Sequence, residues 1–324
     1  DWLAGRSAGV AGSGKPGANP LSLPGRFWTY LQERFPLPSF VLMSMVFSLA
    51  GLSLSSSLRL GSCRLSLFHC LAAMLTTVFL FFQLRVIDEH KDRLNDARYL
   101  PERPVPRGLI SLKELSSLAL ALMTLQLAFA LLAGKVVVLC LFASWVYMWL
   151  MGREFFLSTY LKERPILYML SHMLIMLFVD LLITSYDFGP SNGFATGLLW
   201  FFAASFMSGM VVEFGRKIFA PECEREGIVS YSGYLGLKQA ALWLALFIIA
   251  AQVFLTVCLS HLGQPLAAGL AFVIYDLLCF SALFLGLKKG GPTVSKVFAA
   301  LSNMSVLFGY LVVLLNCTMH SGVN

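Results

Sequence analysis

Long apolar stretches separated by short polar connectors dominate the chain. Nine stretches hold about 20 mostly apolar residues each, which is the length that a helix needs to cross a bilayer. Each stretch is apolar around most of a helical circumference, so the pattern predicts an all-α bundle of nine transmembrane helices and excludes a membrane β-barrel. The predicted spans are residues 38–57, 66–85, 114–134, 136–157, 165–186, 194–212, 239–260, 265–286 and 298–318.

Composition supports a multi-pass integral membrane protein. Apolar residues make up 58% of the chain and charged residues 13%, about half of the roughly 25% that is usual in soluble proteins. So few charges cannot cover the surface of a soluble protein of 324 residues, and the expected surroundings are the lipid bilayer. A cytosolic enzyme, a nucleic-acid-binding module and a secreted disulfide scaffold are excluded. The seven cysteines include no C-x-x-C pair, which argues against a zinc site.

Lysine and arginine predict the orientation. The N-terminal segment and the connectors after the even-numbered spans carry 21 of the 24 cationic residues, and the opposite side carries Arg59, Arg64 and Lys135. The positive-inside rule therefore places the N-terminus and these connectors in the cytoplasm. We expect residues 1–25 to be a flexible segment, residues 26–324 to form one transmembrane domain, and residues 27–35 to lie as an interfacial helix.

Ten of the 17 acidic residues lie in two windows, after the second and the sixth predicted spans. In the first window Asp88, Asp92 and Asp96 recur every four residues, which would stack three carboxylates on one helical face. Like charges at this spacing destabilise a helix, and a divalent cation such as Mg²⁺ would compensate them. The alternative is a solvated helix beside the membrane that is held by ordinary ion pairs.

Cationic residues surround both acidic windows and occur after the fourth span. Carboxylates that bind a metal, together with converging Arg and Lys, are typical of a phosphate or diphosphate site. For each cation alone, the positive-inside rule is a sufficient explanation. The candidate diphosphate-binding cations are Arg85, Lys91, Arg103, Lys162, Arg164 and Arg216.

The run Asp88-Glu89-x-x-Asp92-x-x-x-Asp96, followed by Arg103-Pro104 and Gly108, resembles the first aspartate-rich motif of the UbiA superfamily of intramembrane prenyltransferases. That family has nine transmembrane helices, with motifs in cytoplasmic cap loops after helices two and six. The resemblance implies an enzyme that binds an isoprenyl diphosphate through Mg²⁺. It also implies that Tyr160 joins Lys162 and Arg164 in binding the diphosphate. The implied metal ligands are Asp88, Glu89, Asp92, Asp96, Glu213, Glu222 and Glu224, and the implied catalytic residues are Asp88, Asp92, Asp96 and Lys217.

The chain departs from the family pattern in its second motif. That motif is usually D-x-x-x-D, but here Glu213 is followed by Arg216 and Lys217, and then by Glu222, Glu224 and Glu226 with no aspartate. Lys217 stands where a carboxylate would be expected and would supply positive charge itself. Glutamate also binds Mg²⁺, so the number of ions stays open.

Three functions remain open from the sequence. The first is transfer of the prenyl group to an aromatic or lipophilic acceptor, and the second is cyclisation of farnesyl or geranylgeranyl diphosphate by a UbiA-type terpene cyclase. The third is a non-enzymatic transporter, which would place its charges at mid-membrane. Three ionisable residues inside spans are candidates to orient an acceptor or remove a proton, or else simply form buried polar pairs: His172, Asp180 and Asp276.

Overall fold

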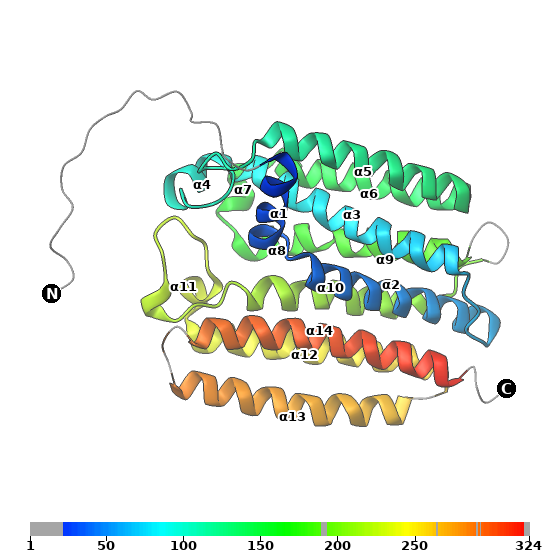
Figure 1. The fold of residues 1–324 in the computed structure, drawn as a ribbon. Coiled ribbons are helices and arrows are strands. Elements are labelled where there is room, and N and C mark those ends of the chain that lie inside the picture. Colours follow the sequence, from blue (N-terminus) through cyan, green and yellow to red (C-terminus); the bar gives the residue numbers. More distant parts are fainter. Residues whose placement is uncertain (1–21, 189–192, 264, 290, 292, 321–324) are drawn as a thin grey trace, which may run out of the picture.

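The computed structural model describes residues 22–188, 193–263, 265–289, 291 and 293–320, and in these ranges the regular secondary structure is entirely helical. Nine candidate spans occur in the described chain, which confirms the predicted all-α class and span number (Figure 1). The fifth span consists of two consecutive helices, α8 and α9. The spans are α2 (Leu37–Leu60), α3 (Leu67–Lys91), α5 (Leu112–Ala133), α6 (Lys135–Gly152), α8 (Pro165–Met173) with α9 (Ile175–Phe188), α10 (Leu198–Gly215), α12 (Leu237–Ser260), α13 (Pro265–Lys289) and α14 (Thr293–His320).

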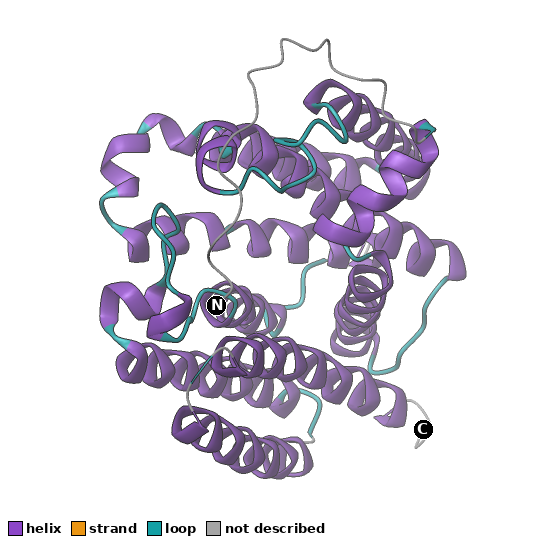
Figure 2. Ribbon diagram, turned by 60° about the vertical axis from the view of Figure 1, so that its left-hand side comes forward, coloured by secondary structure: helices purple, strands orange, loops and turns teal. Residues whose placement is uncertain are grey.

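Short helices gather at one end of the bundle, which we call the capped end (Figure 1). One of them, α1, precedes the first span, and the others follow α3, α6 and α10, the spans whose connectors carry most of the charged residues. Figure 2 shows them joined to the long helices by short loops. These elements are α1 (Leu23–Arg34), α4 (Arg93–Tyr99), η1 (Glu154–Phe156), α7 (Ser158–Lys162), η2 (Pro221–Cys223) and α11 (Tyr231–Leu235).

Several predicted boundaries are wrong. The second span, expected to end at residue 85, continues to Lys91, and the ninth, expected to begin at residue 298, begins at Thr293. The helix expected over 27–35 begins at Leu23, so the segment predicted to be flexible, 1–25, ends inside α1; its residues 1–21 lie outside the described chain. The fourth span, expected over 136–157, ends at Gly152. The chain turns there because Glu154, Phe155 and Phe156 take left-handed φ angles of 49°, 52° and 60°.

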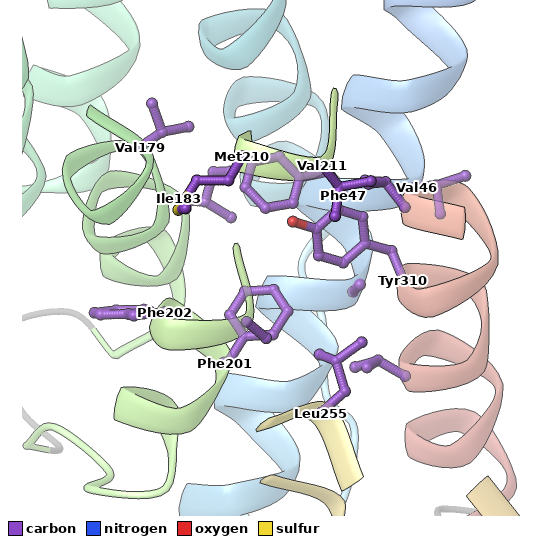
Figure 3. Close-up of a cluster of buried hydrophobic side chains, with 14 of the residues drawn as sticks. Val46, Phe47, Val179, Ile183, Phe201, Phe202, Met210, Val211, Leu255 and Tyr310 are labelled. Carbon is purple, nitrogen blue, oxygen red and sulfur yellow. The ribbon is translucent and has the colours of Figure 1, made fainter. Parts of the chain in front are cut away.

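Aromatic rings fill the centre of the bundle (Figure 3). The ring of Tyr310 on α14 lies 4.8 Å from that of Phe47 on α2 and 5.9 Å from that of Phe201 on α10. A glycine, Gly51, lets α2 approach its neighbours, since a Cβ there would lie 3.1 Å from the Ile183 side chain. Close packing of this kind holds membrane helices together, because lipid supplies no hydrophobic drive for their association.

Helix α1 covers the capped end of α3 and α5. Tyr30 and Phe35 are buried against Phe82 and Val86 of α3 and against Leu115 of α5. The rings of Phe35 and Phe82 meet edge to face, with centroids 5.6 Å apart. The segment expected to lie at the membrane interface therefore packs on the bundle and positions polar side chains beside the end of α3.

Candidate functional site

The first acidic window spans a helix junction. Helix α3 ends at Lys91 and α4 begins at Arg93, with Asp92 between them. The amide of Asp92 donates to the Asp88 carbonyl oxygen at 2.8 Å, and the amide of Asp96 donates to the Asp92 carbonyl oxygen at 2.8 Å. Helical hydrogen bonding thus continues across the junction, but the acids are divided between two helices instead of lining one uninterrupted helix as the sequence suggested.

Asp88 and Asp92 are the accessible acids of the aspartate-rich motif Asp88-Glu89-x-x-Asp92-x-x-x-Asp96. The Asp88 carboxylate has only loose ionic contacts, with Lys91 Nζ at 3.4 Å and Arg85 Nη1 at 3.8 Å. Asp92 forms no ion pair within 4 Å among the described residues. Desolvation by neighbouring chain atoms raises the pKa of Asp92; Lys91 opposes this rise, while the charges of Asp88 and Asp96 add to it. These two acids therefore have the electrostatic need and the open oxygen atoms for a cation.

The other two acids of the aspartate-rich motif, Glu89 and Asp96, are already paired. Glu89 is buried, and its Oε1 accepts a hydrogen bond from Arg34 Nε of α1 at 2.7 Å. Asp96 is also buried, and both of its carboxylate oxygens accept from Arg103 Nη1, at 2.8 and 2.7 Å. Both were predicted as metal ligands; the structure shows them holding α1 and the segment after α4.

The end of α10 brings two cations to the same place. Glu213 is buried and accepts from Arg216 Nε at 2.7 Å, while its other oxygen contacts Lys217 Nζ at 2.6 Å. The charge of Glu213 raises the pKa of Arg216, and Asp88 adds to that effect. The charge of Lys217 in turn opposes the net rise in the pKa of Asp92 that burial causes. The ends of α3 and α10 are therefore electrostatically coupled, and the α10 group has one positive charge in excess.

The remaining acids of the second window form part of the loop. Glu224 accepts hydrogen bonds from the hydroxyls of Ser230 at 2.6 Å and Ser232 at 2.8 Å. Ser230 is also the N-cap of α11, because its Oγ accepts from the Gly233 amide. Glu222 is exposed on η2 and has no ion-pair partner in the described chain. Glu224 thus holds α11 in place, away from the contacts that surround Asp88.

The residues predicted after the fourth span are exposed. Lys162 Nζ lies 3.5 Å from the buried carboxylate of Glu154, and the Arg164 guanidinium lies 3.9 Å from the centre of the Tyr160 ring. None of the described contacts joins Tyr160, Lys162 or Arg164 to Asp88 or Asp92. Their role in binding diphosphate stays a prediction.

Helix α8 contributes a residue that the sequence did not single out. Lys91 Nζ donates a hydrogen bond to the Tyr168 hydroxyl. The Tyr168 ring stacks on that of His172, with centroids 3.9 Å apart and planes 15° apart. The sequence did hold a signal for this pair of rings. Tyr168 and His172 are four residues apart in the helix that Pro165 begins, and this spacing puts both rings on one helical face.

The described part of the chain has no group of three or more His, Cys, Asp or Glu side chains arranged to hold a metal ion. Mg²⁺ commonly uses only one or two carboxylates and takes its other ligands from water and substrate phosphates. Asp88 and Asp92, one helical turn apart and incompletely paired, fit that requirement for one ion. Glu213 and Glu224 do not fit it, because cations and serines already occupy their oxygens.

Known structures resemble this fold along nearly all of its length. A UbiA homologue from Aeropyrum pernix K1 matches with a TM-score of 0.65 at 16% identity, over 85% of this chain and 97% of the other. A structure of digeranylgeranylglyceryl phosphate synthase matches with a TM-score of 0.59 at 17% identity, over 91% and 99% of the two chains. A UbiA homologue from Archaeoglobus fulgidus, bound to DMAPP and Mg²⁺, matches with a TM-score of 0.56 at 15% identity, over 88% and 98%.

Sequence comparison alone does not reveal these relationships: no protein-family profile matches the chain, and no curated protein matches its sequence. The likeness is one of backbone architecture, at identities of 15 to 17%. Together with the nine candidate spans and the helical elements that follow α3 and α10, it shows that this chain has the fold of the UbiA homologues, as the sequence motif suggested.

Proposed function

We propose that this protein is a Mg²⁺-dependent intramembrane enzyme that ionises an isoprenyl diphosphate and transfers the prenyl group to an aromatic or lipophilic acceptor. The observation that carries the proposal is the position of Asp88 and Asp92 beside an excess of cations, at the end of an apolar helical bundle. An isoprenyl diphosphate needs a charged site for its diphosphate and an apolar environment for its long tail. A UbiA homologue of the same fold binds DMAPP and Mg²⁺, and another structure of it holds GPP and Mg²⁺.

In this proposal Asp88 and Asp92 hold the ion. When bound, Mg²⁺ supplies Lewis-acid stabilisation of the negative charge that develops on the diphosphate. Asp96 acts differently, because both of its oxygens accept from Arg103 and so fix the segment after α4. Its contribution is to position the Asp92 backbone, since the amide of Asp96 donates to the Asp92 carbonyl oxygen.

The cations of the chain bind the leaving group. The residues proposed for this role are Lys91, Arg216 and Lys217, because each of them interacts electrostatically with Asp88 or Asp92. Preorganised cations stabilise the charge that forms as the carbon–oxygen bond breaks, which is the largest single contribution in many enzymes. Arg85 lies at the base of this group, 3.8 Å from Asp88.

The capped end would face the cytoplasm, because the connectors that form it carry most of the 24 Lys and Arg residues. The prenyl tail would extend from the site into the apolar interior. A dry interior protects the carbocation from water, which would otherwise convert it to a prenol. Site placement argues against the transporter alternative, because the charged groups lie at the end of the spans and not at their middle.

Purified protein in nanodiscs, incubated with Mg²⁺ and a series of isoprenyl diphosphates, tests the proposal. We expect diphosphate release to fall at least 100-fold in Asp88→Asn and Asp92→Asn. The matched control is Glu33→Gln, which neutralises an exposed acid of α1 outside the site. Release that is undiminished in both aspartate variants would refute the enzymatic assignment.

The same assay separates transfer from cyclisation, the second candidate. A cyclic hydrocarbon formed from farnesyl or geranylgeranyl diphosphate without any acceptor would establish a cyclase. Release of diphosphate that begins only when a phenolic or other lipophilic acceptor is added would establish a transferase.

A further inference from the structure

His172 has a buried nitrogen with no hydrogen-bond partner among the described residues. The side chain is 6% exposed on α8, and its Nδ1 lies 2.8 Å from the carbonyl oxygen of Tyr168. A carbonyl oxygen has no proton to give, so Nδ1 carries the hydrogen and donates it. The other nitrogen, Nε2, therefore bears a free lone pair, and Nε2 is the atom that lacks a partner.

The imidazole ring is fixed in this position. One face stacks on the Tyr168 ring, at 3.9 Å between centroids, and Phe155 meets the ring edge on, at 5.9 Å and 88°. A hydrogen bond from Nδ1 sets the tautomer as well as the orientation. Leaving a buried acceptor unmatched destabilises the folded protein. Packing alone does not require that cost, since an apolar side chain would fill the same space without it.

A short series of contacts links this ring to the diphosphate site. His172 stacks on Tyr168, the Tyr168 hydroxyl accepts from Lys91, and Lys91 contacts Asp88. The charged groups that act on the imidazole are Lys91, Asp88 and Glu213, from α3 and α10. Burial of the ring, and then the positive charge of Lys91, disfavour a positive charge on the imidazole, so the ring is neutral and its lone pair is available.

We propose that Nε2 of His172 accepts the proton that is released when the prenyl cation is converted to product. This inference rests on the proposed function and deepens it. The bond between the prenyl C1 and the diphosphate oxygen breaks, and its electron pair leaves with the diphosphate. The cation then forms a bond to an electron-rich acceptor or to a double bond of its own chain. A carbon- or oxygen-bound proton next to the new positive charge passes to Nε2, and its bonding pair neutralises the product.

Position and charge both suit this step. The cation forms one bond away from the diphosphate, so it arises at the edge of the group that contains Lys91, and His172 lies beside that edge. A proton next to a carbocation is a strong acid, so a neutral imidazole is a sufficient base. The imidazolium that results is attracted by the negative charges of the diphosphate product, Asp88 and Glu213, and these oppose the repulsion from Lys91.

The tautomer is tested without any reaction. Nitrogen-15 spectra of histidine-labelled protein, compared with those of His172→Gln, isolate the signal of this residue. We expect a neutral ring that is protonated on Nδ1. A ring protonated on Nε2, or on both nitrogens at neutral pH, would overturn the inference.

Product analysis tests the role. Wild-type protein, His172→Gln and the control His261→Gln are given Mg²⁺ and geranylgeranyl diphosphate, with whichever acceptor the wild type uses, or with none if it uses none. In His172→Gln we expect diphosphate release within about threefold of wild type, but at least a tenfold fall in the share of prenyl chain that becomes the wild-type product, with prenol in its place. His261 follows the C-terminal end of α12, and the His261→Gln variant should leave both the rate of diphosphate release and the product share unchanged.

The outcomes are distinguishable. If wild-type protein releases no diphosphate from any isoprenyl diphosphate, the proposed function itself fails. If the wild type is active and His172→Gln keeps the wild-type product share, His172 is not the proton acceptor. A variant that loses release and product in equal proportion also overturns the inference, because His172 would then act on ionisation or folding. Tyr168→Phe keeps the stacked ring and the backbone carbonyl, so it should raise KM without altering the product share.

Discussion

The ion pair between Arg34 and Glu89 gives the sharpest test of the structure, because the sequence assigned Glu89 to a metal site. The two side chains are 16% and 1% exposed, and Arg34 Nε lies 2.7 Å from Glu89 Oε1. Arg34→Met would leave a carboxylate buried without its partner. Breaking one side of a buried pair costs about 3–5 kcal/mol. The partial exposure of Arg34 places this case near the lower limit, at about 3 kcal/mol of unfolding free energy.

Replacing both partners should restore most of the stability. The double variant Arg34→Met with Glu89→Met removes both charges and keeps similar volume, and such replacements are commonly neutral. We expect its unfolding free energy to lie within about 1 kcal/mol of wild type. Denaturant titration in mixed micelles measures all variants, and diphosphate release at varied Mg²⁺ concentration measures function. The double variant should keep the Mg²⁺ dependence of the wild type.

An exposed ion pair that also ties α1 to the segment after α4 is the control. Arg107 and Glu33 are 36% and 38% exposed and lie 2.6 Å apart, so Arg107→Met should cost less than about 1 kcal/mol. The hydrogen bond from Arg107 lowers the pKa of Glu33 below its usual 4.5. The small contribution of this ion pair to stability is therefore present above about pH 4.5, and it disappears as the pH falls through the lowered pKa of Glu33. If Glu89→Met abolishes Mg²⁺ dependence at intact stability, or Arg34→Met is no worse than Arg107→Met, the reasoning is refuted.

Three further predictions concern the site and its setting. Lys217→Met should raise the KM for an isoprenyl diphosphate about 10- to 100-fold, as expected for the loss of a charge-assisted contact. Arg216 still pairs with Glu213 in this variant and keeps the fold. An unchanged KM in a steady-state assay would contradict this prediction. Asp180→Asn should keep the melting temperature of the wild type, because Asp180 Oδ1 accepts from Ser205 and Oδ2 has no partner in the described chain. A large fall in melting temperature would show instead that the carboxyl group makes a needed contact. Alkaline phosphatase fused after Gly134 should be active in a bacterial host and inactive after Glu163, and the reverse result would invert the assigned orientation.

Spans were predictable because each depends on a local property, about 20 consecutive apolar residues. The residues at which the spans end were less predictable. The fourth span was expected to continue to residue 157, but three left-handed residues, Glu154 to Phe156, end it early. None of the three is a glycine, so no local residue signal marks the turn. The break at Asp92 likewise lies inside a run whose composition is compatible with one continuous helix.

The site was predictable in part for a similar reason. The spacing of Asp88 and Asp92 follows from the sequence, and the structure leaves these two acids accessible. Whether Glu89 faces a metal or Arg34 depends on where α1 docks, and the two residues lie 55 positions apart. Tyr168 was missed because its contact with Lys91 depends on how α8 packs beside the end of α3. Such long-range pairings cannot be obtained from one sequence without coordinates.

Charge at the end of α10 leads to a prediction about the number of metal ions. Glu213 bears one negative charge and is held by two cations, so this group presents a net positive charge without any bound ion. Asp88 and Asp92 are the only described acids of the two windows that combine accessibility with incomplete pairing next to these cations. A second Mg²⁺ at Glu213 would have to displace Lys217 or Arg216 and would then face their repulsion. We therefore expect diphosphate release to depend on Mg²⁺ with a Hill coefficient near one. Lys217→Glu would add a carboxylate where the UbiA motif has one, and it should make the dependence steeper; a wild-type coefficient near two would show instead that a second ion binds despite the cations.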